Sequence, residues 1–292
     1  MTRKIILFLT SFTLSTFTYG QIKTIAAEKV NSDQSIPKYD SLSNYLGYSP
    51  EPYIGQEFYV NQKAESSRQF GFSGFCIDYK EKMTSLKNTY KPIIPKEENY
   101  VKYDIGGGKT NYDSIVGKYF IVLEILKHPD FSSQRFFKLQ EKISKEILYF
   151  EYDGIYEHNF PFIVTGMFEK YKELFIGKNF VLKCNSCTDI SKCKDFSIDE
   201  TDFEPKLYFE SQTGIKDKVS YKDVFDENKI KLFSEKQSND YKIKFGIKNW
   251  NKILKGEVAI GMTREMCMLS RGVPKEINET ITSNTKSEQW VY

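Results

Sequence analysis

The feature that most limits how this chain can fold is a pattern that occurs three times in its middle. A phenylalanine follows a glycine by three positions, with aliphatic residues around the pair, at residues 54–60, 116–122 and 176–182. The glycines Gly55, Gly117 and Gly177 lie 62 and 60 residues apart (117 − 55; 177 − 117). A second element, Leu-Tyr-Phe-Glu, starts at Leu148 and again at Leu207, 59 residues later (207 − 148). Two elements at nearly equal offsets predict repeated units of about 60 residues.

The repeated pattern predicts β structure. The phenylalanine and the residue two positions later point to one face of a strand, and the glycine permits a turn or bulge before it. Units with several short strands suit small closed barrels, which leave no exposed strand edge. We therefore expect a mainly β fold of tandem SH3-like barrels at 50–100, 101–162 and 163–225, with one continuous antiparallel sheet as the alternative. The first unit is the most divergent because it lacks the Leu-Tyr-Phe-Glu element.

Several further elements can be placed from local patterns. Strands are expected at 135–141, 146–152, 206–211 and 241–245, where apolar and polar residues alternate or β-formers cluster. Helical segments are expected at 167–174 and 248–254, where apolar side chains recur at helical spacing.

The last segment, 226–292, is expected to be a small α+β element. Thr263 suits a helix N-cap, and Met262, Met266 and Leu269 fall on one helical face. Gly272 suits the left-handed residue after the helix, and Pro274 prevents its continuation. Two strands, 276–282 and 288–292, follow around a polar loop, and we expect the helix to bury its apolar face against them.

Residues 256–292 resemble the SmpA/OmlA (BamE-type) family of small outer-membrane assembly lipoproteins. The matching positions are Gly261, Met262, Thr263, Glu265, Leu269, Gly272, Pro274, Trp290 and Tyr292. The sequence departs from the family in lacking a third strand after Tyr292 and a lipid-attachment cysteine. The resemblance implies a role beside outer-membrane protein assembly, with partner docking through Met262, Thr263, Glu265, Gly272, Pro274, Trp290 and Tyr292.

The N-terminus indicates export. A basic start at Arg3 and Lys4, an uncharged apolar run and small residues before Gln21 predict a signal peptide at 1–20, followed by a mobile leader at 21–49. We expect a periplasmic, outer-membrane-associated or secreted protein without a transmembrane segment in its mature chain, and peripheral membrane association stays open. The formal net charge of +3 comes from interspersed charges without the basic stripe of a nucleic-acid binder.

The five cysteines favour disulfides over metal binding. Cys184, Cys187 and Cys193 lie close together without a nearby histidine as fourth ligand, so a disulfide among them, or with Cys76, is expected, with Cys267 free. The glycine-rich stretch at 105–110 lacks the spacing of a phosphate-binding loop. We expect no metal and no cofactor.

Three classes of function fit these patterns. The first is a non-enzymatic envelope protein that binds a protein partner. The second is a secreted enzyme that acts on glycans or peptides through carboxylates, although no residue pair stands out as catalytic. The third is a secreted inhibitor or interaction protein, since the expected helix and hairpin are similar in architecture to those of β-lactamase inhibitory proteins.

Overall fold

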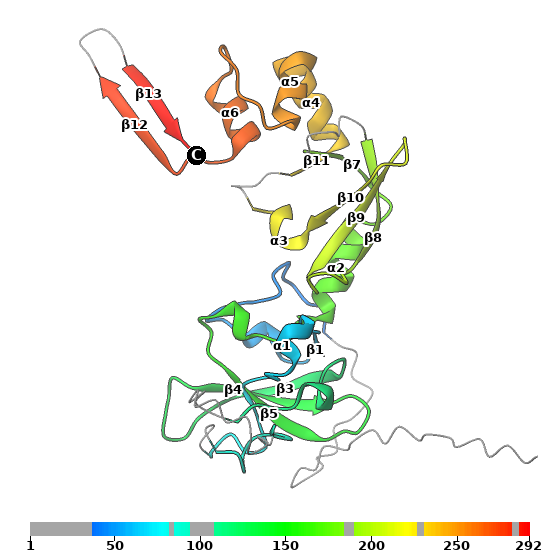
Figure 1. The fold of residues 1–292 in the computed structure, drawn as a ribbon, viewed down its shortest axis with the longest axis vertical. Helices are drawn as coiled ribbons and strands as arrows, with labels where there is room; N and C mark the ends of the chain where they lie inside the picture. The colour runs from blue at the N-terminus through cyan, green and yellow to red at the C-terminus, as the bar shows by residue number, and fades with distance from the viewer. Residues whose placement is uncertain (1–36, 82–84, 94–107, 184–189, 227–230, 282–285) are drawn as a thin grey trace, which may run out of the picture.

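The protein is mainly β, as the sequence predicts. The computed structural model describes residues 37–81, 85–93, 108–183, 190–226, 231–281 and 286–292, so the expected signal peptide and the leader up to residue 36 lie outside the described residues. The described strands form a six-stranded sheet, a five-stranded sheet and a two-stranded hairpin, with antiparallel pairing throughout. Figure 1 shows them in succession along the longest axis of the molecule.

Each of the two larger sheets is built on an antiparallel meander, β3-β4-β5 in the first and β7-β8-β9-β10 in the second, with further strands at its edges. The first has the order β2-β5-β4-β3-β1-β6, with bounds β1 Glu57–Val60, β2 Phe75–Cys76, β3 Tyr119–Lys127, β4 Arg135–Glu141, β5 Ile147–Tyr152 and β6 Phe162–Val164. The second has the order β10-β9-β8-β7-β11, with bounds β7 Asn179–Leu182, β8 Ile190–Ile198, β9 Pro205–Ser211, β10 Lys216–Ser220 and β11 Leu232–Ser234. Single helical turns, η1 Glu51–Tyr53, α1 Glu65–Arg68, η3 Tyr112–Ser114 and η4 Glu157–Asn159, lie in the connections of the first sheet.

The two sheets are built alike, and this likeness is the repeat that the structure contains. Strands β6, β1, β3, β4 and β5 occupy the positions of β11, β7, β8, β9 and β10. A bulge follows Val122 in β3 and Cys193 in β8, and β6 and β11 each lead directly into an 11-residue helix. The equivalent strands β6 and β11 begin 70 residues apart (232 − 162). The Leu-Tyr-Phe-Glu elements therefore fall on non-equivalent strands, β5 and β9.

The first two copies of the glycine pattern belong to one sheet rather than to two successive barrels. There β1 and β3 pair with Phe58 opposite Phe120. The N–H of Gly55 donates to the Val122 carbonyl, and the N–H of Gly117 donates to the Val60 carbonyl, so the pairing is reciprocal. The predicted units 50–100 and 101–162 thus contribute strands to the same sheet and are not separate barrels.

All three glycines make the same backbone turn. Their φ angles are 80°, 74° and 80° at Gly55, Gly117 and Gly177, in the region that side chains with a Cβ rarely adopt. A Cβ at Gly117 or Gly177 would meet no atom within 4 Å, so glycine is needed there for its φ angle and not for space. The phenylalanine three residues later is buried in every copy, as the pattern predicts, at Phe58, Phe120 and Phe180.

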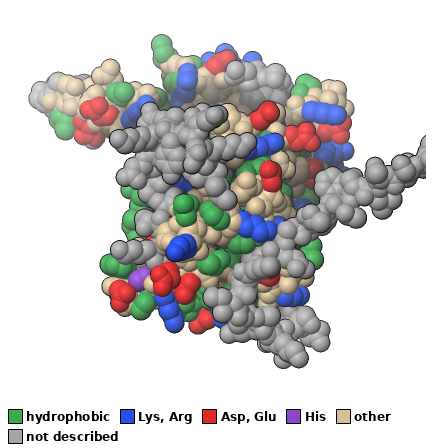
Figure 2. All heavy atoms as spheres, turned by 60° about the horizontal axis from the view of Figure 1, so that its bottom comes forward, with side chains coloured by type: hydrophobic (Ala, Val, Ile, Leu, Met, Phe, Trp, Pro, Cys, Tyr) green, Lys and Arg blue, Asp and Glu red, His purple; other side chains and the backbone are tan. Residues whose placement is uncertain are grey.

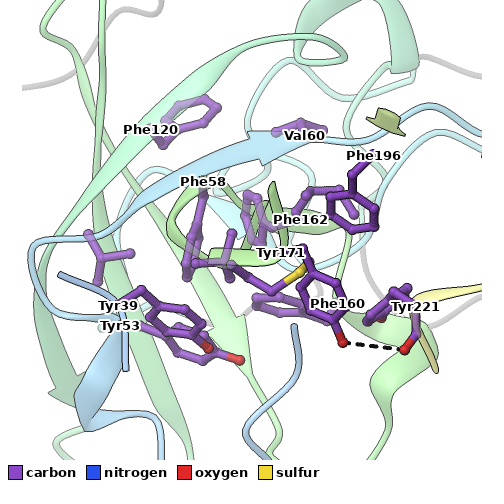
Figure 3. Packing of buried hydrophobic residues seen from close by; sticks show 14 of the residues in the cluster. Tyr39, Tyr53, Phe58, Val60, Phe120, Phe160, Phe162, Tyr171, Phe196 and Tyr221 are labelled. Atoms are coloured by element: carbon purple, nitrogen blue, oxygen red, sulfur yellow. Dashed lines mark hydrogen bonds between the residues drawn. The ribbon is translucent and has the colours of Figure 1, made fainter. Parts of the chain in front are cut away.

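Helix α2, Thr165–Phe175, joins the two sheets into one body. It continues directly from β6, and its face of Met167, Tyr171 and Phe175 is buried. The Tyr171 ring stacks on Phe196 of β8 at 4.8 Å between centroids, and its hydroxyl donates to the Tyr221 carbonyl at 3.3 Å, as Figure 3 shows. One hydrophobic core therefore runs through both sheets. The expected helix at 167–174 is confirmed, although Phe175 replaces Leu174 on its buried face.

Residues 37–49 do not form the expected mobile leader. The Asn44 side chain is buried and pairs with the edge strand β6, donating to the Phe162 carbonyl at 2.7 Å and accepting from the Val164 N–H at 2.8 Å. Tyr39 is also buried, beside Tyr53. The segment covers the outer edge of β6. This contact was not expected, because residues 37–49 show no apolar periodicity.

Helix α3 Tyr221–Val224 lies between β10 and β11, and the second sheet is followed by helices α4 Glu235–Phe245, α5 Ile247–Leu254 and α6 Arg264–Arg271. The expected helix at 248–254 is confirmed, whereas the expected strand at 241–245 is wrong. A capping box between Ser234 and Gln237 starts α4, and helical spacing stacks the ring of Tyr241 on that of Phe245 at 5.5 Å. Both rings then pack beside Trp250.

Candidate functional site

The C-terminal hairpin makes few contacts with the other helices and strands of the described chain. Strands β12 Glu276–Ile281 and β13 Lys286–Val291 pair only with each other among the described residues, and every residue of β12 is exposed. Figure 1 shows the hairpin projecting from the end of the molecule beyond α6. Because α4 occupies residues 241–245, no strand of that segment covers the hairpin. Among the described residues, no strand therefore pairs with either outer edge of the hairpin.

A few polar contacts hold the hairpin against α6. The Arg264 guanidinium pairs with the Glu288 carboxylate, which also accepts from the Trp290 indole N–H at 3.1 Å. Burial and the neighbouring Cys267 raise the pKa of Tyr292. Trp290 stands opposite Ile277 on the hairpin, and its ring lies 6.3 Å from that of Tyr292. The contacts fix the base of the hairpin and leave its far end, with Ile281, in solvent.

The expected burial of α6 against the hairpin is wrong. Met266 and Leu269 instead pack with Val181 of β7, Phe233 of β11 and the apolar face of α5. The second sheet and α5 present several large apolar side chains, so α6 buries more apolar surface there than it would against the two-stranded hairpin. Ile277 and Ile281 of the hairpin remain exposed.

The residues predicted to dock a partner do not form one surface. Thr263 caps α6 by accepting from the Met266 N–H at 3.3 Å, and Gly272, with a φ of 85°, ends it, as the sequence predicts. Met262 is half-buried beside the core under α6. The Glu265 carboxylate pairs with Lys244 of α4 at 2.6 Å. These residues, with the half-buried Pro274, shape and support α6, and the hairpin residues Trp290 and Tyr292 lie beyond it.

A cleft lies between the two sheets. It has two adjoining parts of about 610 and 520 Å³, which share Asn44, Glu157, Tyr221 and Lys222 in their linings. The Lys222 ammonium crosses it, at 3.0 Å from Glu157 and 3.4 Å from Glu204. Burial opposes the charge, but these ion pairs raise the pKa of Lys222. Two of the four carboxylates that line this cleft, Glu157 and Glu204, are thus held in ion pairs with Lys222, and the pair with Glu157 joins the two sheet units.

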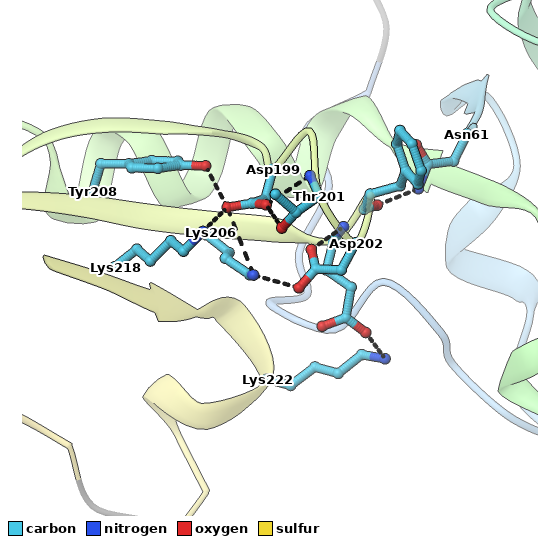
Figure 4. Close-up of polar contacts among 10 residues, drawn as sticks. Asn61, Asp199, Thr201, Asp202, Lys206, Tyr208, Lys218 and Lys222 are labelled. Atoms are coloured by element: carbon cyan, nitrogen blue, oxygen red, sulfur yellow. Dashed lines mark hydrogen bonds and ion pairs between the residues drawn. The ribbon is translucent and has the colours of Figure 1, made fainter. Parts of the chain in front are cut away.

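The turn between β8 and β9 lines this cleft through Asp202, Phe203 and Glu204, and Figure 4 shows the polar contacts around it. Asp199 is buried and accepts from Lys218 at 2.6 Å, from the Thr201 N–H at 2.9 Å and from Tyr208 at 3.0 Å. These hydrogen bonds, that of Lys218 above all, hold the pKa of Asp199 well below its ordinary range. Burial and the bond to Asp199 raise the pKa of Tyr208 to about 12.

Phe203 in the same turn has a φ of 59°, which is uncommon for a bulky side chain. Its carbonyl accepts from the Asn61 side chain at 2.6 Å. Asn61 follows β1 of the first sheet, so this bond ties the two sheets together across the cleft. No sequence pattern pointed to Asn61, Asp199 or Phe203, because their roles depend on contacts between distant segments.

The cysteine cluster is only partly described. Cys184 and Cys187 lie outside the described residues, and Cys76, Cys193 and Cys267 carry free thiols. Cys193 is a buried residue of β8 and not part of a polar loop, because strand alternation points it into the core. Among the described residues, no group of three or more His, Cys, Asp or Glu side chains is arranged to hold a metal ion.

Comparison with protein-family models, with curated proteins and with solved structures found no match for this chain. None of the helices in the described part of the chain has the length and the apolar character that crossing a membrane requires. On the face drawn in Figure 2, Lys and Arg side chains are mixed with Asp and Glu and form no large patch of one sign.

Proposed function

We propose that this chain is an exported, non-enzymatic protein of the cell envelope that binds a protein partner through the β12–β13 hairpin. The observation that carries the proposal is the open hairpin edge. A two-stranded hairpin in water is marginally stable, and unpaired strand edges readily accept a further strand. Addition of a partner strand would complete a sheet of three strands and bury the exposed Ile277 and Ile281.

The cellular setting of the proposal comes from the sequence. The basic and apolar start of the chain favours export, and the SmpA/OmlA-like order of residues 256–292 favours a role linked to outer-membrane protein assembly. The repeated sheets would act as a rigid support. The expected SH3-like modules would correspond to the meanders that begin after Gly117 and Gly177. The ion pairs of Lys222 with Glu157 and Glu204 favour a structural cleft over the enzyme alternative.

Site-specific photocrosslinking in cells tests this proposal. A crosslinking amino acid at Ile281, which is 72% exposed on the hairpin, should give a discrete protein adduct. The matched control is Ile143, which is 89% exposed in the turn between β4 and β5, at the other end of the molecule. An adduct of equal yield from both positions, or from Ile143 alone, would contradict docking through the hairpin.

A further inference from the structure

We propose that the corner between α4 and α5 is a second, separate binding site that docks on an anionic phospholipid surface. The corner consists of residues 242–248, in which Lys242, Lys244 and Lys248 alternate with Ile243 and Ile247 around a turn at Gly246. It belongs to neither the hairpin nor the cleft. The two isoleucines would enter the interface while the lysines contact lipid phosphates.

The two isoleucines are exposed without a structural reason. Ile243 is 85% and Ile247 is 68% exposed, whereas Phe245 between them is buried against Tyr241 and Trp250. Burying such a side chain fully is worth roughly 1.5–3 kcal/mol, so an exposed pair at a protruding corner is a ready contact for an apolar phase.

The structural repeat shows that isoleucine is not required at this place in the fold. Helices α2 and α4 are equivalent, with Tyr171 and Phe175 matching Tyr241 and Phe245 at an offset of 70 residues (241 − 171; 245 − 175). Ile243 therefore corresponds to Glu173, whose side chain is 70% exposed (243 − 70 = 173). The same helical position carries a charge in one sheet unit and an aliphatic side chain in the other.

The charge around the corner complements an anionic surface. Residues 241–256 contain five lysines, at positions 242, 244, 248, 252 and 255, and no acidic residue, so this segment has a formal charge of +5 in a chain whose total is +3. Three acids lie close to it, and one of them, the exposed Glu257, directly follows the segment. Asp240 is exposed on α4, and Glu265 of α6 pairs with Lys244. Lys242, Lys248, Lys252 and Lys255 remain to contact phosphates, each worth about 1 kcal/mol near an anionic leaflet.

Placement in the molecule agrees with docking at this corner. Figure 1 shows α4 and α5 at the end of the molecule opposite to the first sheet. The corner can therefore touch a flat surface without the sheets meeting it. The hairpin leaves the same end to one side, so a partner on the hairpin and a membrane at the corner can be bound together.

Co-sedimentation of the full chain with vesicles tests the proposal. We expect binding to vesicles of equal parts phosphatidylcholine and phosphatidylglycerol, weakened by salt, and little binding to phosphatidylcholine alone. The double variant Ile243→Ser, Ile247→Ser should bind at least about tenfold more weakly, because two apolar contacts are lost. Lys248→Ala should weaken binding about fivefold, as the loss of one lysine at an anionic leaflet predicts.

The controls separate this site from the rest of the molecule. Ile143→Ser, at a still more exposed isoleucine, should leave vesicle binding unchanged, as should removal of residues 288–292, on which the proposed partner docking depends. Because the substituted side chains are exposed, the urea midpoint of each variant should match that of the parent protein. Equal binding to both kinds of vesicle would overturn the proposal. So would unchanged binding by the double isoleucine variant.

Discussion

The substitution Phe58→Ala should cost considerably more stability than the same change at the equivalent residue of the second sheet, Phe180. Phe58 is fully buried, and its ring contacts those of Tyr53, Phe137, Phe160 and Phe162 at centroid distances of 5.1, 5.8, 5.5 and 4.9 Å. Phe180 is 9% exposed and contacts two rings, Phe175 at 5.5 Å and Phe209 at 6.0 Å.

The magnitudes follow from these environments. Truncation of a buried phenylalanine to alanine costs about 3–5 kcal/mol, and each well-formed aromatic pair adds about 0.5–1.5 kcal/mol beyond area. We therefore expect about 5 kcal/mol for Phe58→Ala and about 3 kcal/mol for Phe180→Ala. The first value is a large part of the roughly 5–15 kcal/mol by which a folded protein is stable.

Urea unfolding measures both variants. It should be followed by far-ultraviolet circular dichroism and by tryptophan fluorescence, which reports on Trp250 and Trp290. Because one core runs through both sheets, the two probes should give one midpoint for each protein. A cost at Phe180 equal to or above that at Phe58 would refute the packing argument, and separate transitions for the two probes would refute the inference of one shared core.

Three further predictions concern single groups. The pKa of Asp199 is depressed in the folded protein, so this group stabilises the fold above the ordinary carboxyl pKa of about 4, and that stabilisation is lost as the pH falls towards the pKa of the folded state. Asp199→Asn should therefore lower the urea midpoint at pH 7, and the difference in midpoint between variant and parent should shrink in acid. Burial raises the pKa of Cys193 to about 11 and that of Cys76 further, so brief alkylation and peptide mass mapping should find Cys267 modified first, and equal labelling of all three would count against the described packing. N-terminal sequencing of exported protein should begin at Gln21, and an envelope form that begins at Met1 would disprove signal cleavage.

Local signals in the sequence predicted local structure well. The glycine pattern located three turns of positive φ, and Thr263 and Gly272 marked the ends of α6, because backbone strain and helix caps are decided by a few neighbouring residues. The alternation at 241–245 was misleading because the same residues also satisfy helical spacing, and the capping box at Ser234 decides between the two.

Long-range pairing was not accessible from the sequence. The pairing of β1 with β3, and the equivalence of β4 with β9, depend on which strands meet in space, so matching Leu-Tyr-Phe-Glu elements on β5 and β9 gave the wrong period. Which strands pair with the hairpin is also a long-range property, and among the described residues β12 and β13 pair only with each other.

The most direct test of partner docking at the hairpin is removal of residues 288–292. These residues form most of β13, and β12 is fully exposed, so the deletion should leave the urea midpoint of the sheets unchanged. The partner captured from Ile281 in the full chain should no longer co-purify with the shortened protein. Partner binding that survives this deletion, or that follows the sheets when the hairpin is absent, would contradict docking at the hairpin.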